Sequence, residues 1–188
     1  MRSEQRGYTM IEVIALIAIV GLVTGGAVKA LNKAFSRYKL TRANQQLVEL
    51  QRNIDRRFVA RPSYEGLSLE LLHSENLLPK DMRYAGNKLY HRLSGEVKLN
   101  VGRNANGDDS STYKISFSKL PKYACVELVM QNWGLNPTVS LDNISVGSNT
   151  LKWRCTSSDQ RCYAMPITPV VANHICSNSN NTIFWQFN

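Results

Sequence analysis

Residues 7–28 read GYTMIEVIALIAIVGLVTGGAV and carry a single charge, on Glu12. A run of about 20 apolar residues is long enough to cross a bilayer as one α-helix. A carboxylate in the hydrocarbon core costs at least ~2.5–3.5 kcal/mol, so it is rarely kept there without a partner. The stretch therefore predicts a membrane-inserting helix in which Glu12 has a specific role.

Basic residues flank the apolar run on both sides. The leader MRSEQRG contributes two Arg, and nine basic residues oppose two acidic ones between residues 29 and 61, a net charge of +7. The whole chain carries +9, from 23 Lys and Arg against 14 Asp and Glu, so residues 62–188 are close to neutral at +2. Because no Pro or Gly interrupts the basic region, we expect the helix to continue to about Phe58.

The basic part of this helix is compatible with two kinds of anionic partner, a membrane surface and nucleic acid. A solvated face that anchors at anionic headgroups is the simplest interpretation, and pairing between subunits is an alternative. Nucleic acid is disfavoured because the aromatic residues of a stacking platform are not interleaved here. Apolar residues at helical spacing predict the face that packs on a globular head. They are Ala34, Tyr38, Ala43, Leu47, Leu50, Ile54 and Phe58.

The sequence Gly7-Tyr8-Thr9-Met10-Ile11-Glu12, followed by the apolar run, resembles the class III signal of type IV prepilins and related pseudopilins. The resemblance implies cleavage between Gly7 and Tyr8 by the prepilin peptidase and N-methylation of Tyr8. It also implies that Glu12 neutralises the N-terminal amine of a neighbouring subunit during assembly. The chain would then consist of a leader (1–7), a transmembrane assembly helix (8–28), the basic half of the spine helix (29–61) and a head (62–188).

Other interpretations of the N-terminus remain open. One is a plain signal anchor, and another is an ordinary secretory signal cleaved after Ala30, which would leave an exported disulfide-bonded enzyme or adhesin. A minor pilin or a type II secretion pseudopilin would share the same N-terminal features. Gly21 and Gly25 form a G-x-x-x-G pair that lets a second helix approach closely in a membrane, although glycines also weaken a helix locally.

The remainder of the chain predicts an α+β head. The whole chain, with 188 residues of which 43% are apolar and 20% charged, is long enough for one compact core. Alternation predicts a hairpin of residues 96–101 and 112–117, and short helices are expected at 64–72 and 121–130. Further strands are expected at 139–141, 151–154 and 182–187, the last with the aromatic content of a central strand. The fold class is therefore a long N-terminal helical spine, its N-terminal half transmembrane, packed on an antiparallel-sheet head.

Residues 64–82 carry a second, looser resemblance. Tyr64, Gly66-Leu67, a short helix, Leu78-Pro79 and Met82 follow in an order similar to that of type IVb pilins of the toxin-coregulated and conjugative thin-pilus kind. That resemblance implies a structural subunit that polymerises through its N-terminal helix into a type IV pilus. Adhesion, aggregation, conjugation and DNA uptake all remain open as the role of the pilus.

Four cysteines lie beyond the membrane segment, and an even number in an exported domain indicates two disulfides with three possible connectivities. We favour Cys155–Cys162, which closes a small polar loop, and Cys125–Cys176, which ties the C-terminal region to the expected helix at 121–130. In pilins a comparable link delimits the variable region exposed on the filament. A zinc site formed by the last three cysteines and His174 is disfavoured because no C-x-x-C occurs.

No catalytic motif is recognisable in the sequence. The three histidines sit in no nucleophile motif, and no P-loop, G-x-S-x-G or H-E-x-x-H is present. Asn106, Asp108 and Asp109 do not have the spacing of a calcium-binding EF-hand loop, and an exposed turn explains them better. We therefore expect no catalytic residue, metal or cofactor.

The resemblance to prepilins also implies a location and a set of partners. The subunit would cross the bacterial inner membrane once, with its head in the periplasm, and then join a cell-surface pilus. Its partners would be further copies of the chain, the prepilin peptidase and the pilus assembly machinery. The basic residues after the apolar run favour the opposite orientation by the positive-inside rule. The cysteines favour an exported head, because disulfides form in oxidising compartments. The charge rule is also weak here, because long domains translocate largely regardless of charge.

Overall fold

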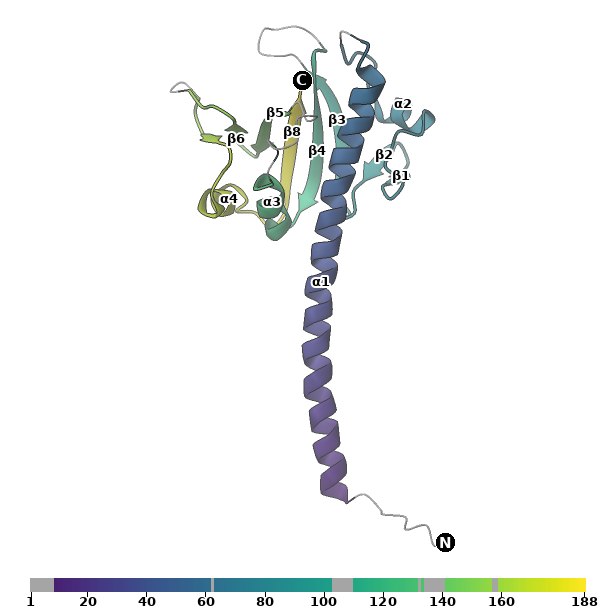
Figure 1. The fold of residues 1–188 in the computed structure, drawn as a ribbon, viewed down its shortest axis with the longest axis vertical. Coiled ribbons are helices and arrows are strands. Elements are labelled where there is room, and N and C mark those ends of the chain that lie inside the picture. Colours follow the sequence, from purple (N-terminus) through teal and green to yellow (C-terminus); the bar gives the residue numbers. More distant parts are fainter. Residues whose placement is uncertain (1–8, 62, 103–109, 132, 134–140, 157–158) are drawn as a thin grey trace. The chain divides into compact units, whose positions relative to one another are not determined.

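The computed structural model describes residues 9–61, 63–102, 110–131, 133, 141–156 and 159–188. They form two compact units, Met1–Lys39 and Leu40–Asn188, and helix α1 (Met10–Phe58) continues from the first into the second. In the second unit, called the head, α2 (Leu69–Ser74) with β1 (Arg83–Ala85) and β2 (Lys88–Tyr90) lies on one side of α1 (Figure 1). Helices α3 (Lys122–Val129) and α4 (Pro169–Ile175) lie on the other side.

Helix α1 forms because its 49 residues contain no proline and are rich in Ala, Leu, Ile, Gln and Arg. The N–H groups of Glu12 and Val13 both donate to the carbonyl of Thr9, at 3.0 and 3.2 Å, and so begin the helical ladder. The expected end at about Phe58 is confirmed.

The head is built on an eight-stranded sheet in the order β1-β2-β3-β4-β8-β5-β6-β7. All neighbours are antiparallel except β6 and β7, which are parallel. The strands are β1 (Arg83–Ala85), β2 (Lys88–Tyr90), β3 (Glu96–Gly102), β4 (Thr112–Leu120), β5 (Leu141–Val146), β6 (Asn149–Lys152), β7 (Cys162–Ala164) and β8 (Asn181–Phe187). The α+β fold class is confirmed.

The core of the head lies between α1 and one face of this sheet. Along β8 the buried residues alternate with half-buried ones, so Ile183, Trp185 and Phe187 all face inward. Leu47, Leu50, Ile54 and Phe58 of α1 are also buried. Rings stack through this layer, with the centroid of Tyr113 5.2 Å from that of Phe187 and Phe117 5.4 Å from Trp185.

The predicted face of α1 extends too far toward the N-terminus. Ala43 and the four apolar residues after it are buried as expected, but Tyr38 is 52% exposed and Ala34 is exposed as well. The helical spacing of apolar residues continues through both positions. Burial depends on a partner surface, and the head provides that surface only from about residue 40 onward.

The predicted hairpin is confirmed as β3 and β4, and β8 is an interior strand between β4 and β5. The helix expected at 64–72 is shorter, because the Ser68 side chain caps it by accepting the Leu71 N–H, and α2 runs over Leu69–Ser74. Helix α3 covers Lys122–Val129, with Pro121 as its N-cap residue. Strands β5 and β6 are offset from the expected 139–141 and 151–154, and residue 139 lies outside the described residues.

Among the described glycines of the head, Gly95 is the one position where a close approach leaves no room for a side chain. A Cβ atom there would lie 1.8 Å from the carbonyl oxygen of Ser118. The turn from His91 to Gly95, closed by the His91 N–H donating to the Gly95 carbonyl at 3.1 Å, packs directly against the end of β4. This contact joins the β2–β3 connection to the sheet.

Candidate assembly surfaces on helix α1

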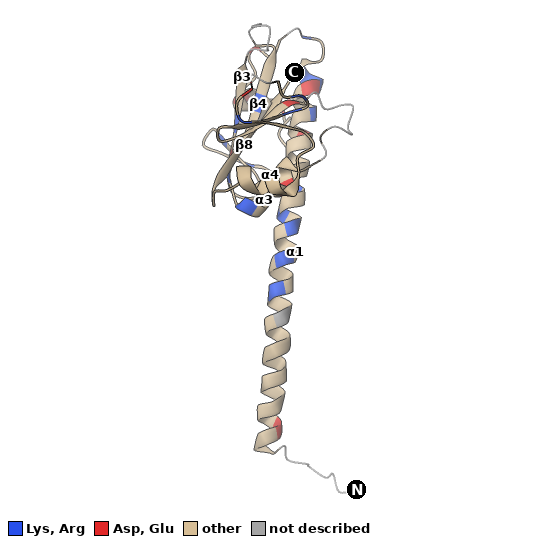
Figure 2. Ribbon diagram, turned by 90° about the vertical axis from the view of Figure 1, so that its left-hand side faces the viewer, with Lys and Arg blue, Asp and Glu red and all other residues tan. Residues whose placement is uncertain are grey.

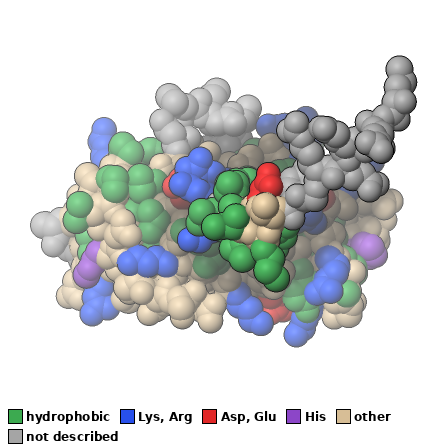
Figure 3. All heavy atoms as spheres, turned by 90° about the horizontal axis from the view of Figure 1, so that it is seen from below, with side chains coloured by type: hydrophobic (Ala, Val, Ile, Leu, Met, Phe, Trp, Pro, Cys, Tyr) green, Lys and Arg blue, Asp and Glu red, His purple; other side chains and the backbone are tan. Residues whose placement is uncertain are grey.

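The first part of α1 exposes a continuous hydrophobic surface. Leu22 is 80% exposed, Val23 68% and Ile17 66%, and the apolar stretch that could cross a membrane has no buried residue within the chain. Figure 3, which looks from the N-terminal end of α1, shows a group of hydrophobic side chains at the centre of the view. Isolated exposed apolar residues are ordinary, but a surface of this extent requires lipid or another protein chain to cover it.

The predicted assembly residues lie on this exposed part of the helix. Glu12 is exposed in the first turn of α1, where a carboxylate is favoured by the helix dipole. Added Cβ atoms at Gly21 and Gly25 would meet nothing within 4 Å, so neither glycine is needed for packing inside the chain. Gly7 and Tyr8, the predicted cleavage and methylation positions, lie outside the described residues.

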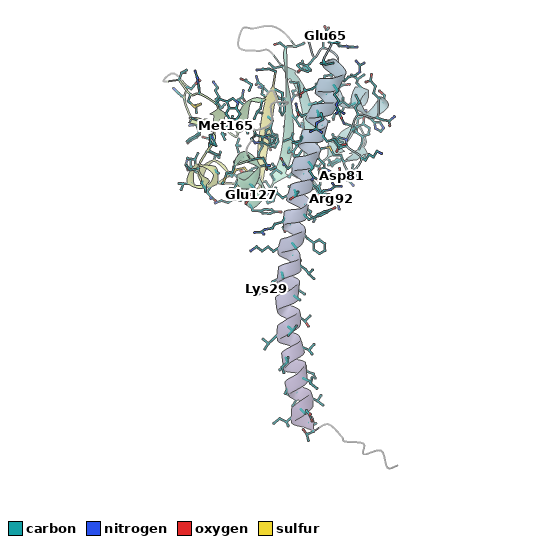
Figure 4. All side chains as sticks on the ribbon, viewed as in Figure 1. Lys29, Glu65, Asp81, Arg92, Glu127 and Met165 are labelled. Atoms are coloured by element: carbon teal, nitrogen blue, oxygen red, sulfur yellow. A yellow bond between two sulfur atoms is a disulfide. The ribbon has the colours of Figure 1, made fainter. Side chains whose placement is uncertain are left out.

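The four basic residues that follow the apolar run are also exposed. Lys29, Lys33, Arg37 and Lys39 have no acidic partner among the described residues. Figure 2 shows successive blue bands of Lys and Arg on α1 beyond a long uncharged stretch, and Figure 4 labels Lys29 on this helix. The first acidic partner along the helix occurs at Arg42, whose Nε lies 3.4 Å from Asp81.

The second part of α1, residues 40–58, is held to the rest of the head by polar contacts as well as by its apolar face. Tyr113 of β4 donates its hydroxyl to Asp55 at 2.6 Å, and Gln51 donates to the other carboxylate oxygen. Burial raises the pKa of Asp55, and the hydrogen bonds from Tyr113 and Gln51 oppose that shift. Burial also raises the pKa of Tyr113, so its hydroxyl stays protonated and acts as the donor.

Two further contacts fix this part of the helix to the segment that follows it. Arg57 forms a two-pronged ion pair with Glu75, in which Nη2 lies 2.8 Å from Oε1. Asn53 donates to the carbonyl of Leu77 at 2.7 Å. The turn that directly follows α2 is therefore held against α1.

The four cysteines form two disulfides in the structure. Cys125 of α3 is bonded to Cys176, which caps the C-terminal end of α4 (Pro169–Ile175), and both are fully buried. Cys155 is bonded to Cys162 at the start of β7. Among the described residues no group of three His, Cys, Asp or Glu side chains is arranged to hold a metal ion. Asn106, Asp108 and Asp109 lie outside the described residues.

Comparisons with known proteins relate this chain to pilus subunits. A family model described as PilS N terminal matches residues 37–188. The major structural subunit of bundle-forming pilus from Escherichia coli O127:H6 is 28% identical over 182 residues, which cover 96% of this chain and 92% of that protein. Its counterpart from Escherichia coli O111:H- has the same identity and coverage.

Two solved structures have the same fold. The type IV b pilin from Salmonella typhi is 15% identical, with a TM-score of 0.52 over 77% of this chain and 98% of that chain. TcpA, a type IV pilin from Vibrio cholerae El Tor biotype, is 10% identical, with a TM-score of 0.51 over 80% of this chain and 99% of that chain.

Proposed function

Because the chain belongs to the family described as PilS N terminal, we propose that it is stored in a membrane through the first part of α1 and polymerises through the same surface. The chain is a structural pilin subunit of the type IVb-like kind, and not an enzyme. The observation that carries the proposal is the hydrophobic surface of the first part of α1, which none of the described residues covers. Lipid covers it before assembly, and the equivalent helices of other copies cover it in the filament.

Processing precedes assembly in this proposal. The prepilin peptidase cleaves between Gly7 and Tyr8, and the new amine of Tyr8 is methylated. This assignment is supported by the class III-like sequence and by the position of α1, which begins at Met10, directly after the proposed cleavage site. Mass spectrometry of the mature N-terminus tests it, because a chain that starts at Tyr8 supports the proposal and one that starts at Leu31 overturns it.

Glu12 supplies the specific contact of assembly. In the apolar centre of a filament its carboxylate needs a positive partner, and the Tyr8 amine of a neighbouring copy provides one charge of the right sign. The Glu12 side chain is exposed in the subunit and lies outside the head. Gly21 and Gly25 give a close-approach face on the same helix, since both have open space beyond their Cα atoms.

The substitution Glu12→Ala tests this contact. We expect it to lower the amount of sheared surface filaments at least tenfold, because a buried amine without its carboxylate costs more than about 1.4 kcal/mol. Membrane insertion should be unchanged. The matched control is Glu49→Ala, which removes an exposed carboxylate from the second part of the same helix and should leave filament yield unchanged. Normal filaments from Glu12→Ala would overturn the assigned role.

The membrane is the bacterial inner membrane, and the head faces the periplasm. Two disulfides support an oxidising compartment for the head. The relatives named as major structural subunits favour a major pilin over a minor one. Purified surface filaments distinguish the two, because a major pilin is their dominant protein and a minor pilin or pseudopilin is not.

A further inference from the structure

The basic residues just beyond the apolar run form a stripe on one face of α1. Lys29, Lys33 and Arg37 are spaced four residues apart, so their side chains lie above one another on the helix. Like charges at this spacing repel, and each pair destabilises a helix by about 0.2–0.5 kcal/mol unless an anion lies between them. All three side chains are exposed and have no acidic partner among the described residues.

The length of the apolar helix places this stripe at a membrane surface. From Met10 to Val28 the helix rises about 28 Å, close to the ~30 Å thickness of a bilayer's hydrocarbon core. Lys29 therefore leaves the hydrocarbon at the depth of the lipid phosphates, and Lys33 lies about 6 Å further along the axis. The headgroup layer is about 5–7 Å deep. Both ammonium groups fall within that layer.

We propose that Lys29 and Lys33, with Arg37 behind them, bind the phosphates of anionic phospholipids on the head side of the membrane. The flexible stems of the two lysines allow the ammonium groups to reach phosphates at different depths. The inference goes beyond subunit assembly, because it assigns a lipid partner to the stored subunit. It rests on the membrane-inserted state of the proposed function but not on cleavage, on Glu12 or on filament formation.

The test uses the full chain reconstituted in phosphatidylcholine bilayers that contain a small amount of spin-labelled lipid. Electron paramagnetic resonance measures how strongly spin-labelled phosphatidylglycerol is immobilised by the protein relative to spin-labelled phosphatidylcholine. We expect a preference for the anionic lipid of up to about fivefold per basic residue in contact. The preference should fall toward one in the double variant Lys29→Gln/Lys33→Gln, and it should weaken at high salt.

The matched control is Arg52→Gln/Arg56→Gln. It removes two positive charges from exposed positions of α1 that belong to the head and have no ion-pair partner within the described part of the chain. The anionic-lipid preference of this control should equal that of the wild type. Gln has nearly the helix propensity of Lys and Arg, so both double variants should fold, and tryptophan fluorescence of the head verifies this.

Several results would overturn the proposal. One is an equal anionic-lipid preference in the wild type and in Lys29→Gln/Lys33→Gln. Another is full loss of the preference on addition of inorganic phosphate at unchanged ionic strength, since this would indicate a site for free phosphate. A third is that Lys29→Gln/Lys33→Gln loses binding of labelled duplex DNA but keeps the anionic-lipid preference of the wild type. Failure of the proposed function itself is recognised separately, because the chain would then not insert into the bilayer at all.

Discussion

The two parts of helix α1 have similar helical geometry and opposite relations to the rest of the chain. Within residues 40–58 the apolar face is buried, and Leu47, Leu50 and Ile54 have no exposed surface. Within the first part, Leu22 and Ile17 are 80% and 66% exposed. The difference indicates that one part of the helix completes its interactions inside the subunit, and the other completes them only with lipid or with further subunits.

Polar residues follow the same division. In the second part, Asp55, Arg57 and Asn53 each bond to a partner in the head. In the first part, the only side-chain hydrogen bonds among the described residues return to the helix's own backbone, from Thr24 to Val20 and from Ser36 to Asn32. Substitutions in the two parts should therefore affect different properties: stability of the head in one and assembly in the other.

The largest contrast is expected between Leu50→Ala and Leu22→Ala. Leu50 is fully buried, so its truncation removes apolar contacts, leaves a cavity and should destabilise the head by about 3 kcal/mol. Leu22→Ala should leave head stability unchanged because its side chain contacts little within the subunit. All three tryptophans lie in the head, so thermal unfolding followed by their fluorescence reports on that unit alone. Equal effects of the two substitutions would contradict the division of the helix.

A smaller contrast is expected between Tyr113→Phe and Tyr38→Phe. The first change removes the hydroxyl that donates to Asp55 and leaves a half-buried carboxylate with one fewer donor, which should cost about 1–2 kcal/mol. Tyr38 is 52% exposed and makes no such bond among the described residues, so its change should have no measurable effect. Denaturant unfolding of the full chain in detergent gives both values, and an unaffected Tyr113→Phe would mean that the buried bond contributes nothing.

Much of this division could be predicted from the sequence, because it rests on local patterns. The apolar run ends at Val28, the helix ends at Phe58, and residues 96–101 and 112–117 alternate as the two strands of a hairpin do. These are short-range signals. The N-terminal limit of the buried face was not predictable, since Ala34 and Tyr38 continue the same spacing and only the extent of the head decides which of them is covered.

The disulfides apart, the side-chain contacts that join distant parts of the chain left no signal in the sequence. Asp55 and Tyr113 are separated by 58 residues, and neither position is unusual on its own. Strands β1, β2 and β7 have three residues each, too few for alternation to be recognised, and the seven residues of α4 are too few for a helical period. Gln46, which accepts the Arg92 N–H at 2.9 Å, could have been suspected only as a polar residue within an apolar stripe.

The smallest expected effect concerns His91, which lies in the head and makes the stability of the head depend on pH. Its Nε2–H donates to the Ser118 carbonyl at 2.9 Å, and its Nδ1 accepts the Leu93 N–H at 3.1 Å, so the neutral ring uses both nitrogens. Burial lowers the pKa of His91, and the bond to Ser118 opposes this only in part. Protonation would also place two N–H groups against each other at Nδ1.

Because the pKa of His91 is lowered in the folded head, the stability of the head changes with pH in a definite direction. Below the ordinary imidazole pKa of about 6.5 the unfolded chain binds a proton that the folded head does not, so stability is lost as pH falls below that value. His91→Gln should remove this part of the pH dependence of unfolding, whereas His174→Gln, at an exposed position, should retain it. Because His91 lies in the head, the acid sensitivity should appear in tryptophan-detected unfolding and leave the helicity of the first part of α1 unchanged. An identical pH profile for the wild type and His91→Gln would show that the ring is not the group that titrates.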